Sequence, residues 1–177
     1  VMGGIADYSG SLVLQLPLAQ ATLAAAQRHG DGAVRIVSLS SDGPGTPRRF
    51  GIACAEVQRL AREGYGVAGE LFRRDPDSRW AGYVVGTLVV LARERGLRLD
   101  TGLRIVIDSR VPEGKGVSSS AALEVAAGFA LQKLYDWSIS GPELAALAQE
   151  AENSFVGVHC GIMDQFVSRM ARPQTAM

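Results

Sequence analysis

Several residue types that mark specialised classes of protein are scarce in this 177-residue chain. Two cysteines cannot build a disulfide framework, and two histidines are too few for a zinc cluster of histidine and cysteine. The 18 basic and 18 acidic side chains cancel, which argues against a nucleic-acid surface or a polybasic membrane patch. No apolar run is long enough to span a bilayer, and the opening residues do not resemble a secretory leader. We therefore expect a cytoplasmic protein with no nucleic-acid or membrane partner.

The residues that are plentiful indicate a folded domain. Hydrophobic residues make up 47% of the chain and charged residues 20%, a balance that excludes bulk disorder. A chain of this length can bury a real core, and no repeat or long linker divides it. We therefore expect one domain over residues 1–177. Its oligomeric state is left open.

Hydrophobic periodicity predicts both strands and helices. Apolar residues alternate in Val34–Leu39 and Leu103–Arg110, which is typical of half-buried strands, and Leu12–Leu18 is predicted as a strand ending near Pro17. The spacing in Trp80–Arg95 predicts a helix closed by Gly96.

The second half of the chain is more helical. A helix is predicted over Ser119–Leu134, and Ser140 and Glu143 have the spacing of a capping box that opens another helix towards Asn153. The expected core stripe of the first helix is Ala122, Val125, Ala126, Phe129 and Ala130. Ala21–Arg28 is ambiguous, because its propensity favours a helix while its flanks allow a strand. The pattern as a whole indicates the α+β class.

The most distinctive local feature is a glycine- and serine-rich loop, Val111–Ala122 (VPEGKGVSSSAA). A predicted strand ends at Arg110, and a helix follows the loop. This order places free backbone N–H groups and the positive end of a helix at one point. Small residues let an anion approach the backbone, and the hydroxyls of Ser118, Ser119 and Ser120 could bind phosphate oxygens or complete a Mg²⁺ shell. The loop therefore indicates triphosphate binding.

Two common phosphate-binding motifs do not match this loop. A P-loop requires Ser or Thr directly after its Lys, whereas Gly116 and Val117 follow Lys115 here. A dinucleotide fingerprint is excluded because Ser119 stands where the third Gly should be. The alternative to a phosphate site is a serine-capped helix after a tight turn.

Acidic residues occur in two further glycine-containing segments. In Ala151–Phe166 (AENSFVGVHCGIMDQF), Glu152 ends a predicted helix and Asp164 follows a Cys-Gly turn, where a carboxylate could serve as a base or metal ligand. In Val1–Leu18, Asp7 lies in an exposed turn before a predicted strand. The alternatives are solvated surface carboxylates at Glu152 and Asp164, and an Asp7 that only stabilises its own turn.

Taken in order, the three segments resemble the GHMP kinases, and in particular their galactokinase branch. The first resembles that branch's sugar signature, Gly-Glu-His-Thr-Asp-Tyr before an apolar strand. The second resembles the phosphate loop Pro-x-Gly-x-Gly-x-Ser-Ser-Ala, and the third the run ending Cys-Gly-Ile-Met-Asp-Gln. Trp80–Val84 also resembles the family's helix ahead of the phosphate loop. The resemblance covers nearly the whole chain, and the ordered set is more specific than any single motif.

The resemblance implies a fold. It is the α+β, two-layer sheet-plus-helices N-terminal domain of the GHMP kinase fold (ribosomal protein S5 domain 2-like), in which Ala21–Arg28 is a strand. The C-terminal domain of the family is absent from this chain, which we expect to be truncated at both ends. We therefore expect weak activity or none from residues 1–177 alone, and an exposed apolar face where a second domain would pack.

The resemblance also implies an activity, the transfer of the γ-phosphoryl group of ATP to the anomeric hydroxyl of a sugar. Asp164 matches the acid that faces the reacting hydroxyl, and Glu152 and Ser120 match the Mg²⁺ ligands, with the choice among the serines left open. The residues that match the ATP phosphate site are Pro112, Gly114, Gly116, Ser118, Ser119, Ser120 and Ala121. The implied small molecules are thus ATP, Mg²⁺ and a sugar.

The sugar-binding residues implied by the resemblance contain one informative departure. They are Gly4, Ile5, Asp7, Tyr8 and Gly161. Gly4 and Ile5 replace the Glu-His pair that helps galactokinases bind the C6 hydroxymethyl group. L-Arabinose lacks that group, and a galactose C6 hydroxyl left unpaired would cost about 1–3 kcal/mol, roughly 5- to 150-fold in affinity. We therefore expect L-arabinose as the substrate. The alternatives are a galactokinase and a non-catalytic regulator that binds sugar and ATP.

Overall fold

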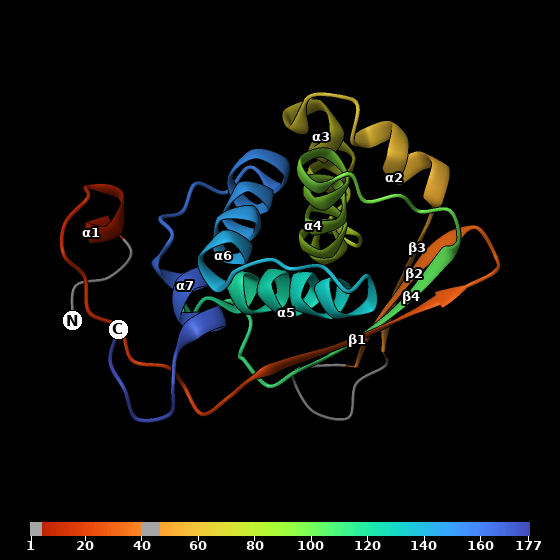
Figure 1. Cartoon of the computed structure of the whole chain (residues 1–177). Coiled ribbons are helices and arrows are strands. Elements are labelled where there is room, and N and C mark those ends of the chain that lie inside the picture. Colours follow the sequence, from red (N-terminus) through yellow and green to blue (C-terminus); the bar gives the residue numbers. More distant parts are fainter. Residues whose placement is uncertain (1–4, 40–46) are drawn as a thin grey trace.

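The structure is a computed structural model that describes residues 5–39 and 47–177, with Ile5 and Tyr8 described by their backbone alone. Within these ranges four strands form one mixed sheet in the order β1-β4-β2-β3 (Figure 1). Their bounds are β1 Thr22–His29, β2 Ala33–Leu39, β3 Arg48–Ala53 and β4 Gly102–Ser109. Strand β4 pairs antiparallel with β1 and parallel with β2, while β3 pairs antiparallel with β2.

Helices cover one face of this sheet, which gives the expected two-layer α+β fold (Figure 1). The helices are α1 Ile5–Tyr8, α2 Cys54–Leu60, α3 Tyr65–Arg74, α4 Arg79–Arg95, α5 Ser119–Leu134, α6 Gly141–Glu150, the π-helix η1 Ala151–Val156 and α7 Met163–Met170. Residues 84–91 of α4 are all buried, because this helix contacts α2, α3, α5, α6 and η1. No helix within residues 5–39 and 47–177 is long and apolar enough to cross a membrane.

Most of the elements expected from periodicity are confirmed. Strand β4 buries Leu103 and Ile105 against the helices and exposes Arg104, as the alternation predicts. Helix α4 ends at Gly96 in the left-handed conformation, with φ 66°. Helix α6 opens with the predicted capping box of Ser140 and Glu143. The ambiguous segment Ala21–Arg28 forms strand β1, as the family resemblance implied.

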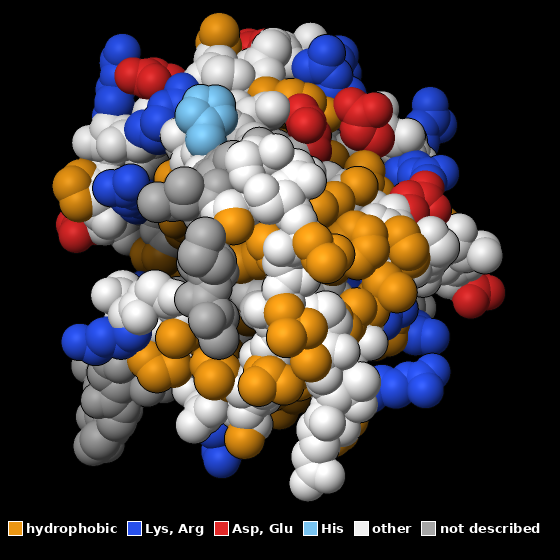
Figure 2. All heavy atoms as spheres, turned by 90° about the vertical axis from the view of Figure 1, so that its left-hand side faces the viewer, with side chains coloured by type: hydrophobic (Ala, Val, Ile, Leu, Met, Phe, Trp, Pro, Cys, Tyr) orange, Lys and Arg blue, Asp and Glu red, His pale blue; other side chains and the backbone are white. Residues whose placement is uncertain are grey.

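The strand predicted over Leu12–Leu18 is wrong. These residues belong to none of the sheet strands, although Gln15 exchanges two backbone hydrogen bonds with Met177, at 2.8 and 3.0 Å. Pro17 cannot donate to a ladder, and the alternation leaves Leu12, Leu14, Leu16 and Leu18 exposed. Alternation specifies which side chains share a face, but it does not supply a partner strand. Hydrophobic side chains gather on one face of the molecule (Figure 2). What covers this face stays a prediction.

The core stripe expected for α5 is also wrong in phase, although the bounds of the helix are correct. Of the expected stripe, Val125 is buried as predicted, whereas Phe129 is 37% exposed and the three alanines are only partly buried. The buried residues of the helix are Ala121, Glu124, Val125, Ala127, Gly128, Leu131 and Gln132. A prediction from the hydrophobic pattern places polar residues on the exposed face of a helix. Because Glu124 and Gln132 are polar but buried, the stripe predicted in this way is displaced from the buried face. The serine cap is not formed either, because Ser118 makes no side-chain cap hydrogen bond.

The helix predicted towards Asn153 is present but changes type. Helix α6 continues directly into η1, whose Phe155 side chain is fully buried. Helix α3 approaches η1 so closely that a Cβ at Gly69 would lie 1.8 Å from the Phe155 carbonyl oxygen. The ring of Phe155 packs against Phe72, with 5.6 Å between centroids, and lies over Gly86 of α4. Glycine at position 69 is therefore a packing requirement.

Two glycines of α3 provide a matched test of this close approach. Gly69→Ala places a methyl group against backbone, so we expect it to lower the free energy of unfolding by about 1–3 kcal/mol. Gly66→Ala meets no atom within 4 Å and should instead raise it by about 0.5–1 kcal/mol through helix propensity. Denaturant unfolding of both variants measures the difference. Equal free energies for the two would contradict the packing.

Candidate active site

The glycine- and serine-rich loop connects β4 to α5 with an unusual backbone. Gly114 and Gly116 both have φ 67°, and Ser118 is left-handed with φ 60° and ψ 43°. A non-glycine residue in this region is uncommon and costs backbone free energy, which is typical of functional loops. Helix α5 starts at Ser119, so the free amides of its first turn point towards the loop. The loop thus offers N–H donors and a positive helix end to an anion.

Two cavities flank this loop. The larger one, about 620 Å³, is lined by Gly116 and Ser118 on one side and by Asp164 on another. The smaller one, about 210 Å³, is lined by Gly114, Ser119 and Ser120, together with the aromatic residues Trp80 and Tyr83. The predicted phosphate loop therefore lies between a cavity that contains a carboxylate and a cavity that contains aromatic rings.

Asp164 lies in the first turn of α7 and is half-buried. The Nε2 amide of Gln15 donates a hydrogen bond to its Oδ1 oxygen. The backbone of Gln15 in turn exchanges two hydrogen bonds with Met177. Asp164 is thus oriented at the wall of the larger cavity.

Asp7 and Gly161 come together, although they lie at opposite ends of the chain. The backbone N–H of Met163 donates to Oδ2 of Asp7 at 2.7 Å. A Cβ on residue 161 would lie 1.9 Å from the same oxygen, so this approach requires glycine. The bond ties Asp7 to the turn that carries Asp164, and Asp7 does more than stabilise its own turn. Gly4 and the side chains of Ile5 and Tyr8, all predicted sugar contacts, lie outside the described residues.

Glu152 is 5% exposed, so the alternative of a solvated surface carboxylate is wrong for this residue. Its Oε2 accepts a hydrogen bond from Gln165 Nε2 at 2.7 Å and a weaker one from the Cys160 thiol at 3.4 Å. Asn153 holds the same turn: it accepts from the Cys160 N–H at 2.7 Å and donates to the Cys160 carbonyl at 3.2 Å. The π-helix thus fixes the turn at Cys160 relative to Glu152.

A second buried carboxyl group lies near Glu152. Glu124 is fully buried, and neither of its oxygens has a hydrogen-bond partner among the described residues. Burial, and then the neighbouring charge of Glu152, raise the pKa of Glu124 well above its ordinary value. Burial and the charges of Glu152 and Glu124 also raise the pKa of Tyr83, which lines the smaller cavity. The two carboxyl groups therefore act electrostatically on that cavity.

The oxygen donors in this region are of the chemical kind that a magnesium ion binds, although no cluster of three or more acidic, histidine or cysteine ligands lies within residues 5–39 and 47–177. Ser120 and Glu124 lie one turn apart on α5, and Glu152 adds a carboxylate that is already oriented by Gln165. Mg²⁺ prefers carboxylate, hydroxyl and phosphate oxygens, and an orphaned buried carboxyl group such as Glu124 is the kind of group a cation would satisfy. Assignment of Ser120 and Glu152 as the ligands stays a prediction.

The residues predicted to bind ATP differ in their exposure and in the cavity that they line. Pro112, Gly114 and Gly116 are exposed on the loop, whereas Ala121 is buried and has only its backbone to offer. Ser118 faces the larger cavity, and Ser119 and Ser120 face the smaller one.

The sequence reasoning missed four residues of the site. They are Gln15, Glu124, Asn153 and Gln165. Two of them carried a signal in the sequence: Glu124 follows Ser120 by four residues on one helix, and Gln165 is adjacent to Asp164. No sequence signal indicated the contact of Gln15 with Asp164, because these residues lie in distant parts of the chain.

Known proteins place this arrangement in a class. Residues 82–172 match the family model of the GHMP kinases N terminal domain, and the chain therefore belongs to the GHMP kinase family. It is 40% identical over 190 residues to the L-arabinokinase of Arabidopsis thaliana. The aligned region covers 95% of this chain and 18% of that protein. It is 36% identical over 178 residues to the galactokinase of Chloroflexus aurantiacus. The aligned region covers 100% of this chain and 40% of that protein.

Solved structures agree with this placement. The galactokinase of Lactococcus lactis complexed with galactose superposes with a TM-score of 0.71 at 29% identity, over 93% of this chain and 38% of that one. The mevalonate kinase of Methanococcus jannaschii, with a TM-score of 0.65 at 16% identity over 82% of this chain and 40% of that one, shares the fold. The chain spans less than half the length of each of these relatives.

The environment of Cys160 gives a chemical test of this geometry. Burial, and then the carboxylate of Glu152, raise the pKa of the Cys160 thiol to about 12, so little thiolate forms at pH 8.5. We expect iodoacetamide to alkylate Cys160 at least about tenfold more slowly in the folded chain than in the denatured chain, measured by peptide mass spectrometry.

The control for this measurement is Glu152→Gln. Removing the negative charge should speed alkylation of Cys160 and leave Cys54 unchanged, because burial comes first among the causes that raise the pKa of Cys54 and Glu152 is not among them. Equal rates in the folded and denatured chains would show that the site is not closed around the thiol.

Proposed function

We propose that this chain is the sugar- and nucleotide-binding domain of an ATP-dependent sugar-1-kinase. In this proposal the enzyme transfers the γ-phosphoryl group of ATP to the anomeric hydroxyl of L-arabinose. One observation carries it: the anion-binding loop before α5 separates a cavity with Asp164 from a cavity with Trp80 and Tyr83. Membership of the GHMP family and the similarity to two sugar kinases support the same reaction.

The loop would hold the phosphates of ATP between the two cavities. Gly114 and Gly116 leave the backbone open to close approach, since nothing lies within 4 Å of a Cβ built on either residue. The first-turn amides of α5 and the hydroxyls of Ser119 and Ser120 add donors. Donors fixed before the reaction stabilise charge on the transferring group, which is the main catalytic contribution in phosphoryl transfer.

The smaller cavity would take the adenine end of the nucleotide. Trp80 and Tyr83 line it beside the serines of the loop. The Arg48 guanidinium lies 5.1 Å from the centre of the Trp80 ring and forms an ion pair with Glu113, which anchors this wall. Flat aromatic side chains beside a phosphate site favour a stacked base.

Asp164 would act on the acceptor hydroxyl from the larger cavity. As the O–P bond forms and the bond from the γ-phosphorus to the ADP oxygen breaks, the hydroxyl proton passes to the Asp164 carboxylate. A carboxylate is a weak base, so its main contribution is to orient the hydroxyl. Gln15 holds the carboxylate in place through Oδ1 and leaves Oδ2 for the substrate.

Glu152 and Ser120 would hold a magnesium ion with the ATP phosphates. The ion supplies charge neutralisation on the phosphate oxygens when bound. Gln165 orients Glu152 for this role, since its amide occupies only one carboxylate oxygen.

The choice of L-arabinose rests on Gly4 and Ile5, which offer no polar side chain to a C6 hydroxyl. Asp7, held against Gly161 and Met163, would contact the ring hydroxyls that arabinose and galactose share. The similarity to an L-arabinokinase over 95% of the chain supports this choice. A galactokinase is the second candidate, supported by relatives of that name and by the Lactococcus structure with galactose. A regulator that binds sugar and ATP without turnover is the third.

The test measures ADP release by the full-length gene product that contains this chain, with ATP, Mg²⁺ and either L-arabinose or D-galactose. We expect a preference for arabinose in kcat/KM of about 5- to 150-fold, the cost of an unpaired C6 hydroxyl. Asp164→Asn should lower kcat by about 10²–10⁴ through loss of the carboxylate.

Asp100→Asn, an exposed substitution of the same chemistry, is the control and should leave kcat unchanged. A preference for galactose would leave the kinase in place and remove the pentose assignment. ATP binding without turnover of either sugar would favour the regulator.

Tryptophan fluorescence tests where the base binds. The chain has two tryptophans, and Trp137 stacks on Tyr135 at 5.2 Å and lines neither described cavity. We expect ATP to quench fluorescence in Trp137→Phe as much as in the parent protein, and to quench it less in Trp80→Phe. Equal quenching in Trp80→Phe and in the parent protein would place the base elsewhere.

A further inference from the structure

The π-helix η1 is the feature that the proposed reaction does not explain. The N–H groups of Gly157 and Val158 both donate to the Glu152 carbonyl at 3.0 Å, and the first of these bonds spans five residues, the spacing of a π-turn. Such turns are rare, occur mostly as single turns inside α-helices, and are frequent at functional sites. An interaction from outside the helix can stabilise this register.

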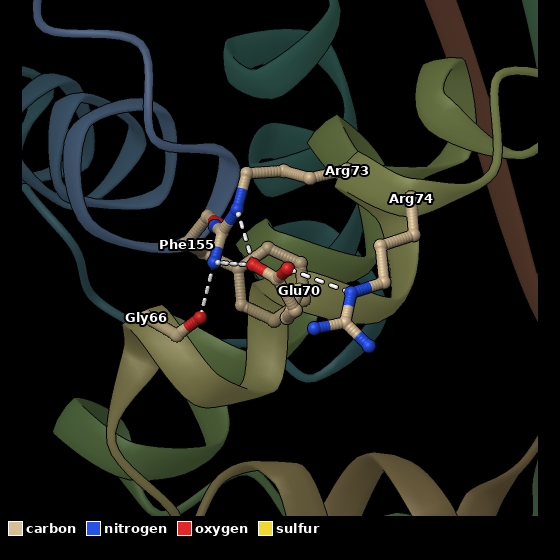
Figure 3. A network of polar contacts seen from close by, with 5 residues as sticks. All are labelled: Gly66, Glu70, Arg73, Arg74 and Phe155. Atoms are coloured by element: carbon tan, nitrogen blue, oxygen red, sulfur yellow. Dashed lines mark hydrogen bonds and ion pairs between the residues drawn. The ribbon is translucent and has the colours of Figure 1, made fainter.

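Arg73 of α3 supplies that interaction (Figure 3). Its Nη1 donates to the Phe155 carbonyl at 2.7 Å, and its Nη2 donates to the Gly66 carbonyl of its own helix. Glu70 accepts from the same guanidinium at 3.2 and 3.0 Å. The guanidinium is thus held on one side by α3 and binds η1 on the other. A carbonyl near the end of a helix lacks an intrahelical partner, and Arg73 satisfies this one.

The contact between Arg73 and the Phe155 carbonyl is closely packed on both sides. Gly69 lies against the Phe155 carbonyl, and a Cβ at Gly157 would lie 3.4 Å from Arg73 Nη1. The Phe155 ring is fully buried beside Phe72. Its ring and its carbonyl are therefore fixed by the same helix, α3, through different atoms.

The register of η1 determines where Glu152 lies relative to the turn that carries Cys160 and Gly161. Glu152 begins the wide turn, and the segment after it carries Cys160 and Gly161. If the turn tightened from five-residue to four-residue spacing, the segment after it would rotate by about 100° relative to Glu152. That rotation would separate Glu152 from the Cys160 thiol and Gly161 from Asp7.

We infer that Arg73 is a positioning residue of the active site, which keeps η1 in its π register and so sets Glu152 against the turn at Cys160 and Gly161. Arg73 acts through the Phe155 carbonyl, and no described contact joins it to Asp164, to the serine loop or to either cavity. Its effect on phosphoryl transfer rests on the proposed function, whereas its effect on the backbone does not.

The chain contains a matched control, Arg74. Both arginines lie on α3 and both bind Glu70, with Arg74 Nε donating at 2.8 Å (Figure 3). Arg74 is not bonded to η1 in the described contacts. Arg73→Gln and Arg74→Gln therefore remove the same charge and the same acidic partner. They differ in the two bonds that Arg73 alone makes, to the Phe155 carbonyl of η1 and to the Gly66 carbonyl of its own helix.

Hydrogen exchange of the full-length protein measures the backbone effect without any ligand. In Arg73→Gln we expect the amides of Gly157 and Val158 to exchange about tenfold faster than in the parent, with the sheet unchanged. In Arg74→Gln they should exchange at the parent rate. Arg73→Lys, which keeps one donor for the Phe155 carbonyl, should recover part of the protection.

Kinetics measure the positioning effect. We expect Arg73→Gln to raise the Mg²⁺ concentration for half-maximal activity about fivefold or more and to lower kcat, while KM for ATP stays within about twofold, because the serine loop is held by α5. Arg74→Gln should match the parent in all three quantities.

Three results would overturn the inference: unchanged exchange at Gly157 and Val158 in Arg73→Gln, equal effects of the two glutamine variants, or faster exchange throughout the chain with no recovery in Arg73→Lys. If the parent protein transfers no phosphate, the kinase proposal fails, and the exchange comparison still decides whether Arg73 holds η1.

Discussion

The packing of Phe155 is the constraint on which the candidate site depends. Its ring lies in the core between Phe72 and Gly86 of α4, and its carbonyl accepts a hydrogen bond from Arg73. Because side chain and backbone are fixed at once, the turn that begins at Glu152 has one position. Glu152 thereby meets Gln165 and Cys160, and the following turn meets Asp7. The core thus determines where the acidic groups of the site stand.

The site also carries an electrostatic cost that a purely structural core would avoid. Glu124 is fully buried without a hydrogen-bond partner among the described residues, and the nearby Glu152 carboxylate adds repulsion. Such a pair destabilises the fold unless a proton or a cation offsets it. In the proposed reaction a magnesium ion would offset this cost, because the cation would arrive with the nucleotide. The left-handed backbone of Ser118 is a second local cost.

Sequence reasoning succeeded where one local signal dominated. The bounds of α5, the capping box at Ser140 and the left-handed Gly96 each follow from residues within a few positions of one another. It failed where burial depends on distant partners. The α5 stripe was misplaced because Glu124 and Gln132 are buried, and Leu12–Leu18 has the alternation of a strand but no sheet partner. The type of η1 was missed because Arg73, its partner, lies in another helix.

The sequence by itself determined the order of the three motifs, and with it the family, because motif residues are read from their spacing along the chain. It also determined the loop that offers amides and hydroxyls to an anion. Only the tertiary structure decided which of these residues meet. Asp7 reaches Met163, and Gln15 reaches Asp164, across almost the whole length of the chain. No local pattern encodes such contacts, since they follow from how the helices pack on the sheet and from the glycines that allow backbone to approach backbone.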